Sequence, residues 1–286
     1  MQERRSFAAP RDLVVRTERD PAQVAAAVRQ AVWAVDKDQP VSNVRTMDQV
    51  FAAAISQERF QALMLGLFAG LALVLACVGL YGVISYTVVQ RTHEIVTRML
   101  AGRPDILEAM AKHGTRLIII GKDQVYTDMP EYRNHPNPQY QNERVRGTGG
   151  LGVTSFGEEN LLNLAGDRYD DESIGVHEFC HTIDGALRSV DSTWSQRRNT
   201  AFQNARAKGL WEFAYTGSNP GEYWGEVCQT YFDTQRVNNW NHNFVGTREQ
   251  LEEYDPIGYE LARTAFNLTP ENDWRYTPMR SLPNVA

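Results

Sequence analysis

The sequence lacks several features that would each assign a function directly. It has no excess of basic residues, because 29 Lys and Arg stand against 35 Asp and Glu for a net charge of -6, so electrostatics gives no case for a nucleic-acid partner. It has no Walker-type phosphate loop, because the glycine-rich stretch 147–150 lacks the Lys and the helix pattern that should follow. We find no internal repeat and no long low-complexity segment. The 286 residues leave room for two domains and a membrane span.

Charge is also missing from one long stretch near the middle of the N-terminal half. No residue between Ala62 and Val89 is charged, and Leu, Ala, Val, Gly and Phe dominate it. About twenty apolar residues cross a bilayer as a helix. The stretch begins too far from the N-terminus for a signal peptide, and a buried core helix is rarely so uniformly apolar. We therefore predict one transmembrane helix at 62–89.

The most specific motif is His177-Glu178-Phe179-Cys180-His181. Residues four apart share one face of a helix, so His177 and His181 can reach one metal ion. Two His ligands, a third protein ligand and an open position for water are the arrangement of catalytic zinc sites. Glu178 lies where it can take the proton of that water. The alternative is a surface helix with two solvated histidines.

Flanking residues predict where this helix begins and ends. The acidic run 170–172 and Ser173 suit a helix N-terminus and its positive dipole end. Gly185 offers a stop on the C-terminal side. We therefore expect the helix to cover little more than the motif itself.

A third ligand is expected on a second helix, within 219–232. Pro220 suits a helix start, and Glu222 and Glu226 are four residues apart, so both can face one site. Two carboxylates buried side by side are costly unless a metal ion or a histidine takes up their charge. We therefore expect both at the metal centre, the alternative being a solvated acidic stripe.

Read as HEFCHTID from His177 to Asp184 and as GEYWGE from Gly221 to Glu226, these residues resemble the catalytic domain of the anthrax lethal factor and Pro-Pro endopeptidase type of metallopeptidase. The likeness covers about residues 104 to 280, and its specific motifs lie within 177–226. It implies an α+β, zincin-like fold that binds Zn²⁺ and hydrolyses a peptide or protein substrate. The substrate preference does not follow from it.

The resemblance also implies roles for individual residues. Glu222 would be the third zinc ligand, and Tyr215 would stabilise the oxyanion. Asp184 would accept a hydrogen bond from a ligand histidine, and Glu226 would support the ligands from behind. Zn²⁺ would polarise the scissile carbonyl while Glu178 accepts the water proton and passes it to the leaving amine. For Tyr215 the alternative is an aromatic residue that only packs.

The remainder of this domain shows alternating strand and helix signals. Residues 115–121 read as a short buried strand, and 147–156 as an edge strand along which an extended peptide could lie. We expect a helix at 254–266 and a packed end at Trp274 and Tyr276. The domain is therefore expected to be α+β.

The N-terminal segment predicts a strand at 13–17 and helices at 20–35 and 47–57. Together with the span at 62–89 and the basic RTHEI segment that follows, it resembles the macrolide-export-type (FtsX-like) ABC transporter permeases. The resemblance implies a truncated α/β extracytoplasmic segment at 1–61 and a cytoplasmic segment at 90–103 that touches an ABC ATPase. The remaining membrane helices of that family are absent from this sequence.

The chain thus reads as a permease fragment, 1–103, joined to a metallopeptidase domain, 104–286, with a seam near 101–107. It is either a membrane-tethered protease or an accidental fusion, and truncation of the permease part favours the second. Two further functions stay open: a permease fragment with an incidental C-terminal domain, and a zinc-binding domain that only binds peptides. The intact Glu178 argues against the last, because binding alone needs no general base.

The distribution of basic residues and a possible disulfide predict opposite sides of the membrane for the C-terminal domain. Basic residues are denser after the span than before it, which places the single-pass protein's C-terminal domain in the cytoplasm. Cys180 and Cys228 lie on the two predicted ligand helices, and a disulfide between them would imply an exported domain. Cys77 lies within the span and reads as a packing residue.

Overall fold

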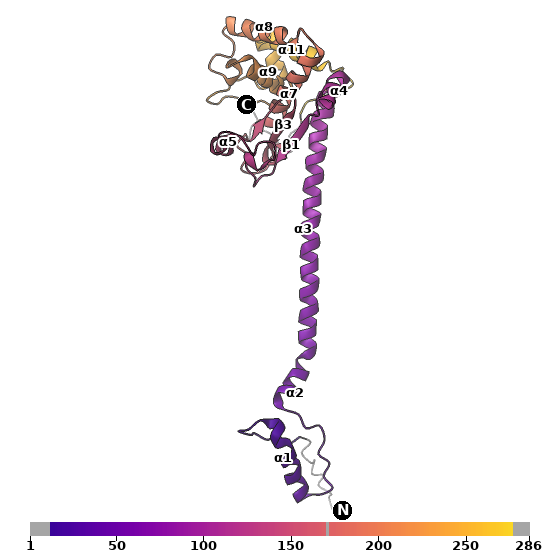
Figure 1. The fold of residues 1–286 in the computed structure, drawn as a ribbon. Coiled ribbons are helices and arrows are strands. Elements are labelled where there is room, and N and C mark those ends of the chain that lie inside the picture. Colours follow the sequence, from indigo (N-terminus) through magenta and orange to yellow (C-terminus); the bar gives the residue numbers. More distant parts are fainter. Residues whose placement is uncertain (1–11, 170–171, 277–286) are drawn as a thin grey trace, which may run out of the picture. The chain divides into compact units, whose positions relative to one another are not determined.

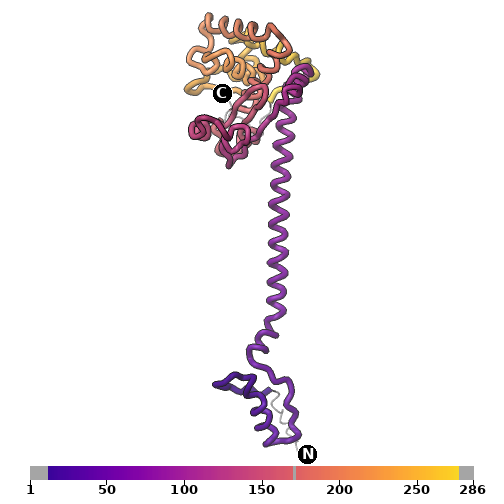
Figure 2. Tube along the Cα trace, viewed as in Figure 1, coloured from indigo at the N-terminus to yellow at the C-terminus, as the bar shows by residue number. Residues whose placement is uncertain are grey.

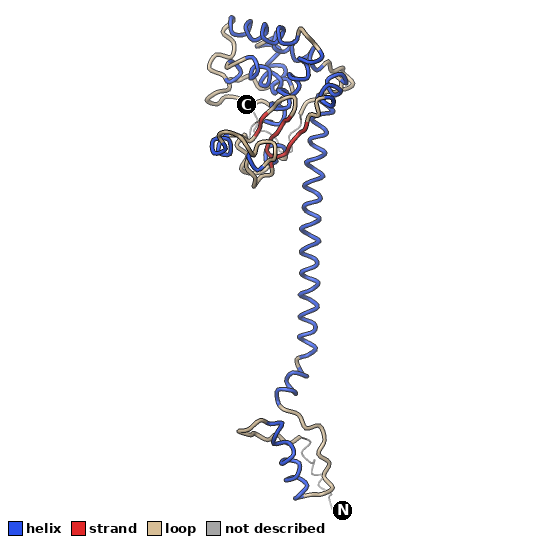
Figure 3. Tube along the Cα trace, viewed as in Figure 1, coloured by secondary structure: helices blue, strands red, loops and turns tan. Residues whose placement is uncertain are grey.

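The computed structural model describes residues 12–169 and 172–276. The chain divides into two compact units, Met1–Gly79 and Leu80–Ala286. It is rich in helix and has one small sheet of three strands among the described residues (Figure 3). The α+β class expected from the sequence is therefore observed.

In the first unit, helices α1 (Pro21–Val35) and α2 (Met47–Ala54) agree with the two predicted helices. Asp20 caps α1 through its side chain, and Thr46 forms a capping box at the start of α2. The strand predicted at 13–17 is wrong, because these residues form neither strand nor helix. A strand needs a hydrogen-bonded neighbour, and the three strands found in the described residues all lie beyond residue 115.

Helix α3 (Ser56–Met99) is continuous over 44 residues and contains the whole apolar stretch. Among the described residues it alone is long and apolar enough to cross a membrane, with a mean hydropathy of 2.6 in its most apolar part. Side chains along this part face outward, with Leu65 69% and Leu73 67% exposed. A helix rises about 1.5 Å per residue, so 62–89 exceeds the roughly 30 Å of a bilayer core.

The segment after the apolar stretch belongs to the core of the second unit. Ile95, Met99 and Leu100 are at most 1% exposed and join the main apolar cluster. Helix α4 (Pro104–Lys112) follows at once and adds Ile106 and two more buried residues to the same cluster (Figure 2). The boundary expected at residue 104 thus falls inside a compact unit that begins at Leu80.

Close contacts also fix the seam, residues 101–107, against the rest of the second unit. A Cβ at Gly102 would lie 2.1 Å from the carbonyl oxygen of Asn267, so only glycine fits there. Arg103 donates to the carbonyl of Ala265 at 2.6 Å and pairs with Asp105. The seam is therefore built into the fold of the second unit.

The sheet has the order β1-β3-β2, with β1 (Arg116–Ile120) parallel to β3 (Val153–Gly157) and β2 (Gly147–Thr148) antiparallel to it. The strand predicted at 115–121 is confirmed as β1. The single edge strand predicted at 147–156 is wrong, because the chain reverses between β2 and β3 at a glycine-rich stretch. As a result β3 is central and only the two residues of β2 form that edge.

Helices cover the sheet and complete the unit (Figure 1). In chain order they are η1 (Tyr126–Asp128), α5 (Pro138–Arg144), α6 (Glu158–Leu161), α7 (Ile174–Val190), α8 (Trp194–Ala207), η2 (Tyr215–Gly217), α9 (Pro220–Tyr231), α10 (Arg248–Tyr254) and α11 (Pro256–Phe266). α7 packs on β3 on one side and on α9 on the other. The expected helix at 254–266 corresponds to α11 and the end of α10, and Trp274 is buried at 9% exposure.

Helix α7 continues past Gly185, so the stop predicted there is wrong. A Cβ at Gly185 would come within 2.8 Å of the Leu151 Cβ. Glycine is needed at this position for the close approach of the 149–152 stretch, not for a cap.

Candidate metal centre

Helix α7 supplies two of the candidate ligands. Ser173 caps its N-terminus by accepting from the backbone N–H of Val176. The acidic residues 170–171 expected beside this cap lie outside the described residues. Phe179 and Ile183 are fully buried, which fixes the rotation of the helix and turns His177 and His181 toward α9.

Helix α9 supplies the third candidate ligand, Glu222. Asn219 caps it by accepting from the backbone N–H groups of Gly221 and Glu222, at 2.9 and 3.0 Å. Gly225 then allows α9 to meet α7 closely, because a Cβ there would lie 2.8 Å from Cε1 of His177. This contact places Glu222, in the first turn of α9, against both histidines.

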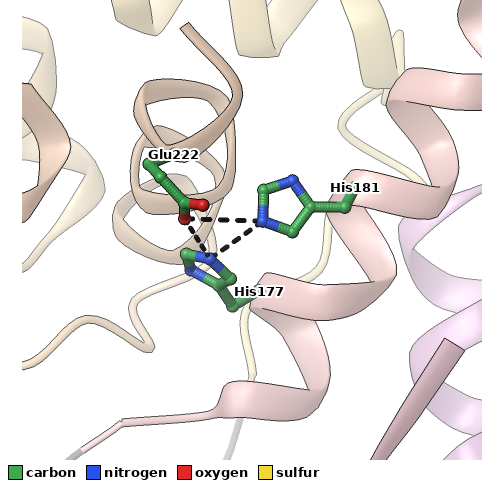
Figure 4. Close-up of side chains that lie close together, drawn as sticks. All are labelled: His177, His181 and Glu222. Carbon is green, nitrogen blue, oxygen red and sulfur yellow. Dashed lines mark hydrogen bonds and ion pairs between the residues drawn. The ribbon is translucent and has the colours of Figure 1, made fainter. Parts of the chain in front are cut away.

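The three side chains point their donor atoms at one place (Figure 4). His177 Nε2 lies 3.1 Å from His181 Nε2 and 3.1 Å from Glu222 Oε2, and the His181–Glu222 separation is 3.6 Å. Zinc ligands at about 2.0–2.2 Å in a tetrahedron are about 3.3–3.6 Å apart. The observed triangle is therefore close to three corners of a zinc tetrahedron, and its donor set suits that ion.

The charges around the triangle attract a cation. Burial by itself lowers the pKa of His177, but its hydrogen bonds to the Glu222 and Glu226 carboxylates raise that pKa well above its usual value. Burial raises the pKa of Glu222, and contacts with His177 and His181 outweigh that effect and lower it. Because metal ions and protons compete for such ligands, a divalent cation can supply the positive charge in place of a proton.

Glu178 lies on the sheet side of the triangle. Its side chain runs past Gly147 of β2, where a Cβ would be 3.0 Å from its Cγ. Burial raises the pKa of Glu178, and His177 and His181 oppose this shift. A carboxylate with a raised pKa next to a metal position is suited to accept and return a proton.

Tyr215 lies in η2 with its hydroxyl hydrogen-bonded to Glu222, and burial together with the Glu222 charge raises its pKa. Its backbone N–H donates to the carbonyl of Asn241 at 2.7 Å. The nearby aromatic residues differ in exposure: Trp211 is buried, Phe213 is 94% exposed, and Tyr215 is 42% exposed.

Behind the triangle, Gln229 and Glu226 contact the other nitrogen of His177. His177 Nδ1 lies 2.7 Å from Gln229 Oε1 and 3.3 Å from Glu226 Oε1. Glu226 is 2% exposed, and although burial opposes it, hydrogen bonds with His177 and His242 lower its pKa to about 2. The expected place of Glu226 beside the ligands is therefore observed.

Asp184 does not contact a ligand histidine, contrary to expectation. Its carboxylate accepts from Trp194 Nε1 at 2.8 Å and from Arg198 at 2.6 Å, both on α8, and it pairs with Arg188. Gln229 takes the role expected of Asp184.

Sequence reasoning missed Gln229, Gly225, Glu172 and His242. Gln229 follows Glu222 by seven residues, two helical turns, so the periodicity of α9 could have identified it. Glu172 lies before the α7 cap, and its carboxylate accepts from Gln229 at 3.3 Å. His242 comes from a loop, where no periodic signal exists.

Cys180 and Cys228 face each other between the two ligand helices as free, fully buried thiols. Burial and the Cys180 neighbour raise the pKa of Cys228. The structure thus contains the pair without a disulfide, and Cys77 is free and exposed on α3.

No protein-family model, curated protein or solved structure matches this chain.

Proposed function

We propose that this protein is a zinc-dependent metallopeptidase with a zincin-like catalytic unit, carried on a single membrane-spanning helix. The observation that supports this most strongly is the triangle of His177, His181 and Glu222 donor atoms, 3.1 to 3.6 Å apart. A carboxylate and a phenol border the same triangle, as amide hydrolysis requires.

His177, His181 and Glu222 would hold the zinc ion, which when bound would supply Lewis-acid chemistry to the attacking water. Glu178 accepts a proton from the attacking water and delivers it to the leaving amine. The Tyr215 hydroxyl, which interacts with Glu222 at the rim of the triangle, would donate to the developing oxyanion. Gln229 and Glu226 hold the ring of His177 with Nε2 turned inward.

The edge of the sheet offers a place for an extended peptide. β2 pairs with β3 on one side only, and Gly147 lies directly against Glu178. A peptide that pairs with this edge would be held by main-chain hydrogen bonds, with little demand on its sequence.

The buried seam supports a membrane-tethered protease over an accidental fusion. Ile95, Met99 and Leu100 would have no reason to complete the core of an unrelated domain. The same burial commits one side of the segment 90–103 to the core of the second unit, while His93 and Arg98 stay exposed. We propose that this segment serves the catalytic unit.

The long apolar helix α3 is the basis for proposing a single-pass membrane protein. The bias of basic residues after the span favours a catalytic unit in the cytoplasm. Free thiols at Cys180 and Cys228 are consistent with that side.

The test is cleavage of a mixed peptide library by the full chain in detergent micelles, loaded with zinc, with a chelated aliquot alongside. We expect cleavage that stops on chelation and returns when zinc is added back. A folded, zinc-loaded protein that cleaves no peptide would reject the peptidase and leave a peptide-binding role.

A further inference from the structure

A second group of buried polar side chains lies directly behind the metal centre. Glu172, Glu226 and His242 bring their ligand-type atoms within 4.8 Å of one another. Their side chains are 6%, 2% and 7% exposed. Glu172 precedes α7, Glu226 is on α9, and His242 is on the loop between α9 and α10. The mechanism proposed above assigns His242 no role.

The contacts of His242 fix the orientation of its ring. Asn239 Oδ1 accepts from the backbone N–H groups of Asn241 and His242 at 3.0 and 2.9 Å, which identifies this atom as the oxygen. His242 Nδ1 lies 2.9 Å from the same oxygen and must therefore donate to it. Nε2 lies 3.4 Å from Glu226 Oε2 and 4.0 Å from Glu172 Oε2. Both ring nitrogens of His242 therefore face side-chain oxygens, Nδ1 toward Asn239 and Nε2 toward the two carboxylates.

Two series of side-chain contacts connect the ring of His242 to Nδ1 of His177. In the first, the other oxygen of Glu226 lies 3.3 Å from His177 Nδ1. In the second, Glu172 accepts from the amide of Gln229 at 3.3 Å, and the Gln229 oxygen accepts from His177 Nδ1 at 2.7 Å. Arg236 Nη2 lies 3.8 Å from Glu172 Oε1, and Thr216 and Gln235 donate to Glu226 Oε2, so each carboxylate has a further partner. His242 approaches both carboxylates and thereby links the two series of contacts.

We propose that His242 is a positioning residue of the metal centre: its ring holds Glu226 and Glu172, which orient His177 directly and through Gln229. The proposal rests on the proposed function, because it takes the triangle to be a zinc site. Partners beyond the ligands that orient a metal-binding histidine change metal affinity by about 10- to 100-fold.

The experiment measures the zinc dissociation constant of the full chain in detergent micelles by competition with a chromophoric chelator. The variants are H242A, E226Q and the double variant, and H113A serves as control because His113 is exposed and distant in sequence from the site. We expect H242A to weaken zinc binding by about 10- to 100-fold and H113A to leave it unchanged. Because His242 acts through Glu226, the two substitutions together should weaken binding by less than the product of their separate effects.

An unchanged dissociation constant in H242A, or fully additive effects in the double variant, would overturn the proposal. So would a wild-type stoichiometry of two zinc ions that falls to one in H242A, because His242 would then be a ligand. If H242A fails to fold by circular dichroism, H242Q, which keeps one donor toward Glu226, replaces it and should lose less affinity than E226Q. Wild-type protein that binds zinc but cleaves no peptide rejects the peptidase and leaves this test intact.

Discussion

Two leucines, one within the apolar stretch 62–89 and one directly after α3, meet opposite environments. Leu73, within α3, is 67% exposed, whereas Leu100, one residue beyond the end of α3, is 1% exposed. The exposed part of the helix is covered only if a bilayer surrounds it, and the buried part is covered by the protein's own core. One continuous helix therefore joins an apolar stretch that is exposed in the protein to turns that are buried in it, and the second compact unit begins within that helix.

The largest effect is expected from cutting the chain on either side of the buried turns. A chain of residues 104–286 loses Ile95, Met99 and Leu100 from the core. Each large apolar side chain removed from a core costs about 2–5 kcal/mol, and the sum rivals the roughly 5–15 kcal/mol that stabilise a domain. We expect residues 104–286 to be unfolded and residues 85–286 to be folded, measured by circular dichroism and thermal unfolding. Cooperative unfolding of the shorter chain would show that the last turns of α3 are dispensable.

The next largest effect is expected from substitution of Glu178, the proposed proton acceptor. Glu178→Gln removes the proton acceptor but keeps the size of the side chain and leaves the three ligands untouched. We expect kcat to fall by about 10²- to 10⁴-fold with the zinc content unchanged, measured by peptide cleavage and metal analysis. Activity close to wild type would reject Glu178 as the base, and loss of zinc would make it a structural residue.

Matched substitutions at Leu100 and Leu73 test the difference between the buried and the exposed leucine. Leu100→Ala should destabilise the protein by about 2–5 kcal/mol because it leaves a cavity in the core. Leu73→Ala should change the unfolding transition of the catalytic unit very little, because its side chain contacts solvent or lipid. The measurement is thermal unfolding of both variants in the same micelles. Equal shifts of the unfolding temperature would contradict the difference between the two leucines.

The smallest effect is expected at Tyr215, on the rim of the centre. Tyr215→Phe removes the hydroxyl that contacts Glu222 and should lower kcat by about 10²-fold, the usual cost of one oxyanion donor. The stability and the zinc affinity should stay close to wild type because the side chain is 42% exposed. An unchanged kcat would support the interpretation of Tyr215 as a packing residue.

The ligand positions were predictable because their spacing is a property of the helix. His177 and His181 share a face in any α-helix, and the spacing of Glu222 and Glu226 predicted both at the same site, whereas only the resemblance singled out Glu222 as the ligand. The partner of Asp184 was not predictable, because Trp194 and Arg198 compete for its carboxylate from a helix that the sequence did not place. The position of His242 beside the site could not be predicted either, because a loop has no periodicity.

The same limits explain the errors in the fold. The strand at 13–17 was inferred from composition, but strands need partners and none is provided within the described residues. The segment 147–156 has strand composition throughout, and only its glycine-rich middle reverses it into β2 and β3.

The sequence by itself determined the long apolar helix, the shared face of His177 and His181, and the start of α9, because each depends on composition or on spacing within one element. Only the tertiary structure decided that Leu100 is buried and Leu73 is not. It likewise decided that Gly225 admits the ring of His177, and that Gln229 and His242 stand behind it. These outcomes depend on which surfaces meet, and contacts between elements distant along the chain leave no local signal.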